Sequence, residues 1–137
     1  MNAEGGATGN CRLTQAECIK SKLLIDKLFV GGGSRSLAAF PIRLVYMVIE
    51  RGEHEPPASI MVSVPKRCFK RAVKRNRVKR QLREAYRLNK QLLWQRMAEK
   101  PGEQVLMAFV WTDNQLHETA HVERKMRNLL TRLSEKL

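Results

Sequence analysis

The positive charge of this sequence is concentrated between Pro65 and Lys90. These 26 residues hold twelve lysines and arginines and a single acid, Glu84, so they carry +11 of the formal net charge of +13. Guanidinium and ammonium groups bind phosphate oxygens, and a cluster of one sign is costly to fold unless a polyanion neutralises it. The segment therefore predicts binding to nucleic acid, the most common polyanion, without distinguishing RNA from DNA.

Neither a solvated helix face nor a membrane-binding surface accounts for the basic segment as well as nucleic acid does. A solvated helix face usually alternates the sign of its charges, whereas a helix here places Arg75 beside Lys79 and Arg83 beside Arg87. Each such like-charge pair costs up to about half a kcal/mol. A membrane surface usually requires a large apolar face beside the charge, and no stretch approaches the ~20 apolar residues of a membrane span. We therefore expect a soluble, cytoplasmic protein with no membrane contact.

A second pattern could do chemistry of a different class. Residues 117–121 read His-Glu-Thr-Ala-His, the spacing with which zinc peptidases bind their metal from one helix face. A third ligand is needed, and Glu135 is the candidate in the short stretch that follows His121. No downstream segment remains to build a substrate cleft. We therefore expect an ordinary solvent-facing pair of histidines, no metal site and no catalytic residue on this chain.

The elements that precede the basic segment follow from hydrophobic periodicity. Residues 21–30 place Leu24, Ile25, Leu28 and Phe29 on one face of a short helix, with Ser21 as its N-cap and a glycine-rich run to end it. Residues 40–50 and 58–64 are rich in β-branched types and predict two strands, paired antiparallel to each other. Pro65 should end the second strand because proline cannot donate to the ladder.

The period changes to 3.6 within the basic segment, which predicts one helix over residues 71–97. Its apolar stripe comprises Val78, Leu82, Ala85, Asn89, Leu92 and Leu93. The far side carries Arg80, Arg83, Arg87 and Lys90. A buried strand is predicted over 104–110, and residues 112–115 have the spacing of a capping box before a last helix. The apolar face of that helix comprises Val122, Met126, Leu129, Leu130, Leu133 and Leu137.

These elements predict an α+β domain in which helices pack against one sheet. The periodicity assigns the order helix, strand, strand, helix, strand, helix. Residues 1–12 are expected to form a disordered tail because they are mostly small, polar and glycine-rich. Residues 13–137 are expected to form a single domain.

The order of residues in the basic segment closely resembles the signature of the bacterial ribonuclease P protein component. The match begins at Lys66-Arg67 and continues as Ala72-Val73-x-Arg75-Asn76-Arg77-Val78-Lys79-Arg80-x-x-Arg83-Glu84-Ala85-Tyr86-Arg87. The resemblance extends to Leu28-Phe29-x-x-Gly32 and covers residues 19–135 in all. The chain departs from the family at Ile25, where an aromatic residue is usual, and at 68–71, where the family commonly carries a glycine.

The resemblance implies a fold and two sets of contact residues. The fold is a two-layer α/β sandwich around a four-stranded sheet, with the order αβββαβα and a left-handed β–α–β crossover. The implied RNA-contact residues are Lys66, Arg67, Arg75, Asn76, Arg77, Lys79, Arg80, Arg83 and Arg87. A cleft for the single-stranded 5′ leader of precursor tRNA is implied at Ile25, Phe29 and Tyr46, and the rings of Phe29 and Tyr46 would stack on bases regardless of sequence. The alternative for Phe29 and Tyr46 is an ordinary position in the core.

The resemblance also implies a function. The chain would be the protein subunit of ribonuclease P, with the RNA subunit and precursor tRNA as partners and no obligate protein partner. The RNA subunit with bound Mg²⁺ would cut the phosphodiester bond, and the protein would raise substrate affinity and lower the magnesium requirement. A generic RNA-binding protein, such as a ribosomal protein, is the alternative, because it shares the basic patch but requires no leader cleft.

Overall fold

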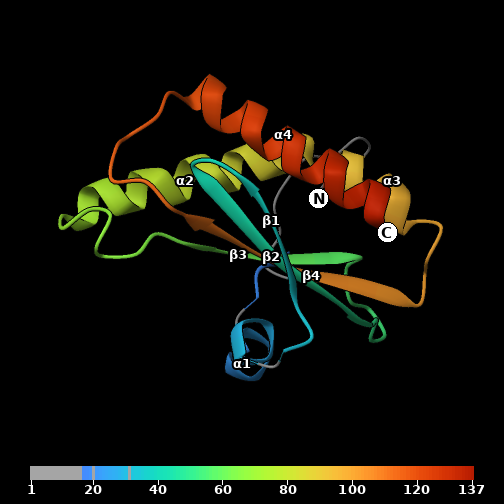
Figure 1. The fold of residues 1–137 in the computed structure, drawn as a ribbon. Helices are drawn as coiled ribbons and strands as arrows, with labels where there is room; N and C mark the ends of the chain where they lie inside the picture. Colours follow the sequence, from blue (N-terminus) through green and yellow to red (C-terminus); the bar gives the residue numbers. More distant parts are fainter. Residues whose placement is uncertain (1–16, 20, 31) are drawn as a thin grey trace, which may run out of the picture.

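The structure is a computed structural model that describes residues 17–19, 21–30 and 32–137. The predicted tail at 1–12 lies outside these residues. The order αβββαβα is confirmed, except that the helix after the third strand is divided into two (Figure 1). The elements are α1 (Lys22–Val30), β1 (Arg35–Ala39), β2 (Ile42–Glu50), β3 (Ala58–Ser63), α2 (Ala72–Asn89), α3 (Gln91–Met97), β4 (Glu103–Trp111) and α4 (Thr119–Lys136).

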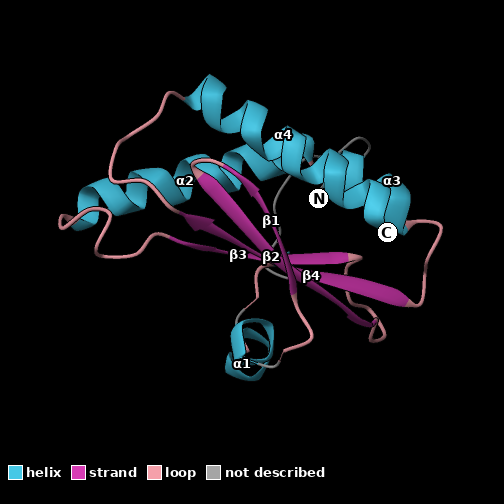
Figure 2. Ribbon diagram, viewed as in Figure 1, coloured by secondary structure: helices cyan, strands magenta, loops and turns pink. Residues whose placement is uncertain are grey.

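The four strands form one sheet with the order β1-β2-β4-β3 (Figure 2). β2 is antiparallel to both of its neighbours, and β3 is parallel to β4. The predicted antiparallel pairing of residues 58–64 with residues 40–50 is therefore wrong. Parallel strands need a long crossover connection, and α2 and α3 provide it between β3 and β4. β1 is the strand that periodicity alone did not identify and that the resemblance implied.

The helices lie in two unequal groups on the two faces of the sheet. Figure 1 shows α2, α3 and α4 over one face and α1 alone on the other. Side chains of a strand alternate between faces, and β2 follows this rule. Ile42, Leu44 and Tyr46 join the main core under the three helices, whereas Val45 packs with Leu28 of α1. The sheet thus separates a large core from a small one.

The predicted helix over 71–97 is broken at Lys90, between α2 and α3. Five residues of the predicted apolar stripe are buried, namely Val78, Leu82, Ala85, Asn89 and Leu93. Leu92 is 39% exposed instead. The break changes the rotational phase of the last turns, so that α3 buries Leu93 and Met97. Tyr86 is also fully buried, and burial raises the pKa of its hydroxyl.

The last helix begins later than predicted. Residues 112–115 are not a capping box, since α4 starts at Thr119 with Glu118 as its N-cap. Thr112 is held by the sheet instead, because its backbone N–H and its hydroxyl both donate to the Pro41 carbonyl, at 2.9 and 3.1 Å. The predicted apolar face is confirmed, with Leu137 only half-buried.

The first helix begins as predicted. The hydroxyl of Ser21 accepts the N–H of Leu24 at 3.4 Å, which makes Ser21 the N-cap. α1 ends at Val30, ahead of Gly32, whose φ of 76° lies in the left-handed region that favours glycine. Across the part of the chain that the structure describes, none of the helices has the length and apolar character to cross a membrane.

Candidate nucleic-acid interface

The apolar stripe of α2 determines which residues of the basic segment face solvent. Val78, Leu82 and Tyr86 lie at i, i+4 and i+8 and are buried against the sheet and α4. Ala85 and Asn89 are buried beside this stripe, and the opposite side of α2 points outward. The predicted RNA-contact residues that are exposed are Lys66, Arg67, Asn76, Arg77, Arg80 and Arg83, and those that are half-buried are Arg75, Lys79 and Arg87. We call the α2 residues of this set, from Arg75 to Arg87, the basic face.

Arg77, Arg80 and Arg83 on the basic face form no ion pair with an acid of the described chain. Among the residues placed by the structure, none of the ion pairs within 4.0 Å includes Arg77, Arg80 or Arg83. α2 also has no acid in its first turn. Since an ion pair would neutralise these guanidinium groups, the absence of one within the described residues leaves their positive charge open to phosphates.

Arg87 differs from these three arginines. Its guanidinium pairs with both carboxylate oxygens of Glu84, one turn earlier on α2. The hydrogen bond from Arg87 lowers the pKa of the Glu84 carboxyl from its ordinary value. The only acid in the basic segment is thus engaged by one of its own arginines.

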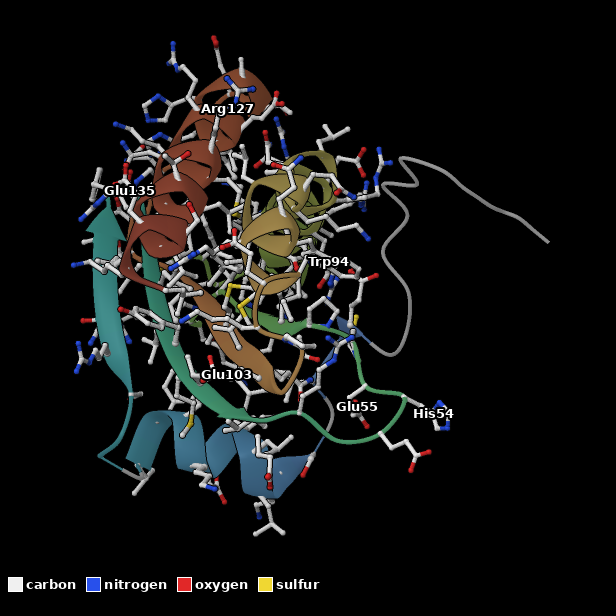
Figure 3. The ribbon with its side chains drawn as sticks, turned by 90° about the vertical axis from the view of Figure 1, so that its right-hand side faces the viewer. His54, Glu55, Trp94, Glu103, Arg127 and Glu135 are labelled. Carbon is white, nitrogen blue, oxygen red and sulfur yellow. The ribbon has the colours of Figure 1, made fainter. Side chains whose placement is uncertain are left out.

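Lys90 is not on the basic face, contrary to the prediction. It is 2% exposed, and its ammonium group donates to both carboxylate oxygens of Glu17 at 3.0 and 3.1 Å. The same ammonium lies 4.7 Å from the ring centre of Trp94, on α3 (Figure 3). Lys90 therefore joins α2 to the segment before α1 instead of reaching solvent.

Arg75 also has contacts within the fold. One of its guanidinium nitrogens donates to the carbonyls of Phe69 and Lys70, both at 2.8 Å. Phe69 is buried in the main core. Arg75 thus fixes the turn that leads into α2, in the region where the sequence departs from the family pattern, and part of its role is structural.

The basic face borders an open hollow between α2 and the start of α4. The hollow has a volume of about 290 Å³ and is lined by Arg77, Arg80, Gln81, Glu84 and Thr119. The amide of Gln81 holds the two helices together, since it donates to the His117 carbonyl and the Thr119 hydroxyl, both at 3.1 Å. Two guanidinium groups therefore stand at a concave surface, where a phosphate can approach both.

The three residues predicted to line a leader cleft do not lie together. Ile25 is half-buried and Phe29 is 46% exposed on α1. Tyr46 is only 6% exposed and belongs to the core on the opposite face of the sheet. Its neighbour Met47 packs on the side of α1. Val45 and Met47 share the face of β2 that α1 covers, and Tyr46 lies on the other face because side chains alternate along a strand.

The His-Glu-Thr-Ala-His pattern does not adopt the zinc-peptidase arrangement. His117 precedes α4, Glu118 caps it, and only His121 is within the helix. The Nε2 atom of His117 lies 2.6 Å from the Asp113 carboxylate. Glu135, near the C-terminal end of α4 (Figure 3), is about 21 Å from His121 along the helix axis. No group of three metal-binding side chains occurs within 17–19, 21–30 and 32–137.

Comparison with known proteins decides the family. The Ribonuclease P family model matches residues 13–134, nearly the whole chain. The chain belongs to this family. A ribonuclease P protein component of Porphyromonas gingivalis is 42% identical over 123 residues, which cover 89% of this chain and 86% of that protein.

Solved structures of ribonuclease P proteins have the same fold. The protein from Thermotoga maritima aligns over 83% of this chain and 96% of its own, with a TM-score of 0.60 and 19% identity. A mutant ribonuclease P protein of Staphylococcus aureus aligns over 87% of this chain and 89% of its own, with a TM-score of 0.65 and 16% identity. At these identities the likeness concerns the fold.

Proposed function

We propose that the chain is the protein subunit of a bacterial ribonuclease P and binds the catalytic RNA through the basic face of α2. The observation that carries this proposal is the absence, among the described residues, of a carboxylate partner for Arg77, Arg80 and Arg83. Unpaired guanidinium groups on a rigid helix gain more from phosphate contact than groups that already have a salt bridge. Membership of the ribonuclease P family supports RNA as the polyanion.

The complex would remove the 5′ leader of precursor tRNA by endonucleolytic hydrolysis. Mg²⁺ prefers oxygen ligands in an octahedral arrangement. Helix α2 does not fit this ion, because its single carboxylate, Glu84, is already paired with Arg87. We propose that the hydrolytic ions bind phosphates of the RNA subunit and that this chain contributes positive charge and binding surface.

The leader is proposed to bind on the side of the sheet that carries α1. Phe29 offers a partly exposed ring there, and Ile25 lies one turn earlier on α1. Stacking on an aromatic ring tolerates any base, which suits a leader of variable sequence. Tyr46 is omitted because it packs on the opposite face of the sheet. Met47 and Ile49 are included because they pack on the α1 side.

Reconstitution tests this function. The purified chain is mixed with a bacterial ribonuclease P RNA and precursor tRNA at low Mg²⁺, and release of the 5′ leader is measured. We expect stimulation over the RNA alone, and a loss of stimulation when Arg77, Arg80 and Arg83 are replaced by alanine. The matched control replaces Arg96, Lys100 and Lys136, three cations outside the basic face, with alanine.

Two outcomes would contradict the proposal. Absence of stimulation, with RNA binding intact, would favour a generic RNA-binding module. Equal loss in the two triple variants would show that total charge, and not the basic face, is what matters. A Phe29→Ala variant tests the leader contact separately, since it should weaken binding of precursor tRNA more than binding of mature tRNA, which lacks the leader.

A further inference from the structure

The proposed function gives no role to His117 and His121. Their rings stack, with centroids 5.1 Å apart and planes inclined by 21°. Phe40 lies edge-on to His117 at 6.1 Å, and Trp111 lies edge-on to the same ring at 5.3 Å. We call Phe40, His117 and His121 the ring cluster. It joins the turn between β1 and β2 to the start of α4.

The ring cluster has a buried part and an open part. Trp111 is fully buried and supports His117 from within the core, while Phe40 is 61% exposed. The position of Phe40 is fixed by its chain neighbour, because the Pro41 carbonyl accepts two hydrogen bonds from Thr112. His117 is fixed by Asp113 at 2.6 Å. The backbone beside Phe40 is thus held to the sheet, and a side chain on a fixed backbone loses less conformational entropy when a ligand binds it.

The ring cluster is continuous with the basic face. Gln81 donates to the carbonyl of His117 at 3.1 Å and also lines the hollow that contains Arg77 and Arg80. On the other side, a guanidinium nitrogen of Arg124 lies 3.1 Å from the Nδ1 atom of His121. The rings thus stand between cations on α2 and a cation on α4. This combination of aromatic faces and adjacent positive charge is the one that binds single-stranded nucleic acid.

The surroundings of His121 favour the neutral form of its ring. Loss of hydration, together with the nearby His117, Lys125 and Arg124, lowers the pKa of His121 from its ordinary value, with Glu118 opposing the shift. An imidazole is an aromatic ring of the kind that stacks on unpaired bases.

We propose that the ring cluster stacks on an unpaired base of the RNA whose phosphates contact Arg77 and Arg80. Phe40 and His121 contact the base, and His117 positions them. The ligand class is an unpaired nucleobase of any type, since stacking on an aromatic ring does not depend on which base is stacked. The inference rests on the proposed function in that both involve the same RNA, but it concerns base contact, which the basic face does not supply.

The test separates base contact from phosphate contact. Binding of a short single-stranded oligouridine is compared with binding of an abasic oligomer of the same length, which retains the phosphates and lacks the bases. Phe40→Ala should weaken oligouridine binding by about 5- to 100-fold, the range for loss of one stacked base, and should leave abasic binding unchanged. Phe40→Trp should preserve oligouridine binding. His121→Ala should also weaken oligouridine binding, by a smaller factor than Phe40→Ala.

Controls make each outcome decisive. Leu23→Ala removes an exposed apolar side chain on α1 and should change neither affinity. Thermal unfolding followed by circular dichroism checks that the Phe40 variants fold. An equal loss of affinity for both oligomers would overturn the inference. No loss of affinity for either would also overturn it and would favour a protein as the partner of the Phe40 ring. A loss of affinity confined to oligouridine would support base stacking even if the reconstituted complex did not cleave precursor tRNA. The test of base stacking is therefore independent of the test of the proposed function.

Discussion

Along α2, Arg77, Arg80 and Arg83 differ from Arg87 and Lys90 in what surrounds their charge. The first three face solvent, and no carboxylate of the described chain lies within ion-pair distance of them. Arg87 is paired with Glu84, and Lys90 is buried against Glu17. The sequence presents all five as one basic run, and the structure divides them into two groups.

The difference teaches that a cation's role depends on its acidic partner more than on its position in a basic segment. A cation that is paired within the fold contributes to stability and has little left to offer a phosphate. A cation with like-charged neighbours destabilises the free protein and is relieved when a polyanion binds. The amino-terminal part of α2 is therefore suited to binding, and its carboxyl-terminal end is suited to holding the N-terminal segment in place.

The largest effect is expected at the buried pair. Lys90→Ala leaves the Glu17 carboxylate buried without its ammonium partner, so the free energy of unfolding should fall by about 3–5 kcal/mol. Urea unfolding measures this change. Lys100→Ala is the control, because Lys100 forms a half-exposed pair with Glu103 at 4.0 Å and should cost less than about 1 kcal/mol. Equal losses in the two variants would remove the distinction between the two ends of α2.

A smaller effect of opposite sign is expected on the basic face. Arg83→Glu replaces like-charge contacts with Lys79 and Arg87, four residues away on either side, by attractive ones. The free protein should therefore gain about 1 kcal/mol of stability, while its affinity for ribonuclease P RNA should fall. Urea unfolding and RNA titration of the same preparation measure both quantities. If the variant instead lost stability and kept its RNA affinity, Arg83 would stabilise the fold, as Arg87 and Lys90 do, and would not bind RNA.

The smallest effect concerns the ionisation of Glu84. Arg87 holds the pKa of this carboxyl below its ordinary value, and Arg87→Ala should return it toward that value. A carboxyl whose pKa is lowered by folding stabilises the native state above its unfolded pKa, and this contribution is lost as the pH falls through the folded pKa. Carbon-detected NMR titration of Glu84 in both proteins measures the shift. An unchanged titration would show that the ion pair does not persist in solution.

Periodicity was sufficient for the elements whose burial depends on local sequence. The stripe from Val78 to Asn89 and the apolar face of α4 were both predicted, because a helix that packs against a sheet must place its apolar residues every three or four positions. The basic face follows from the same stripe, since the residues between the buried ones point outward.

Features that depend on distant partners could not be predicted in this way. The partner of Lys90 lies 73 residues away in sequence, so nothing near Lys90 indicates its burial. Whether Tyr46 faces α1 depends on which side of the sheet α1 covers. A shift of one residue in the register of β2 would place the side chain on the other face. The pairing of β3 with β4 likewise depends on the crossover through α2 and α3.

The salt dependence of RNA binding shows most directly whether Arg77, Arg80 and Arg83 contact phosphates. If six to eight cations of the chain contact phosphates, the slope of log affinity against log salt concentration should lie between about −4 and −7. Replacing Arg77, Arg80 and Arg83 with alanine should flatten this slope by about 2 to 3 units. Arg75 is left unchanged in this variant because its guanidinium also donates to the carbonyls of Phe69 and Lys70, so its loss would disturb the fold as well as RNA binding.

The control for this measurement removes the same number of charges elsewhere. Replacing Arg96, Lys100 and Lys136 with alanine lowers the net charge equally, but two of these residues are paired with acids and none lies on α2. We expect a flattened slope for the α2 variant and a slope close to that of the unaltered protein for the control. Equal slopes in the two variants would contradict this expectation.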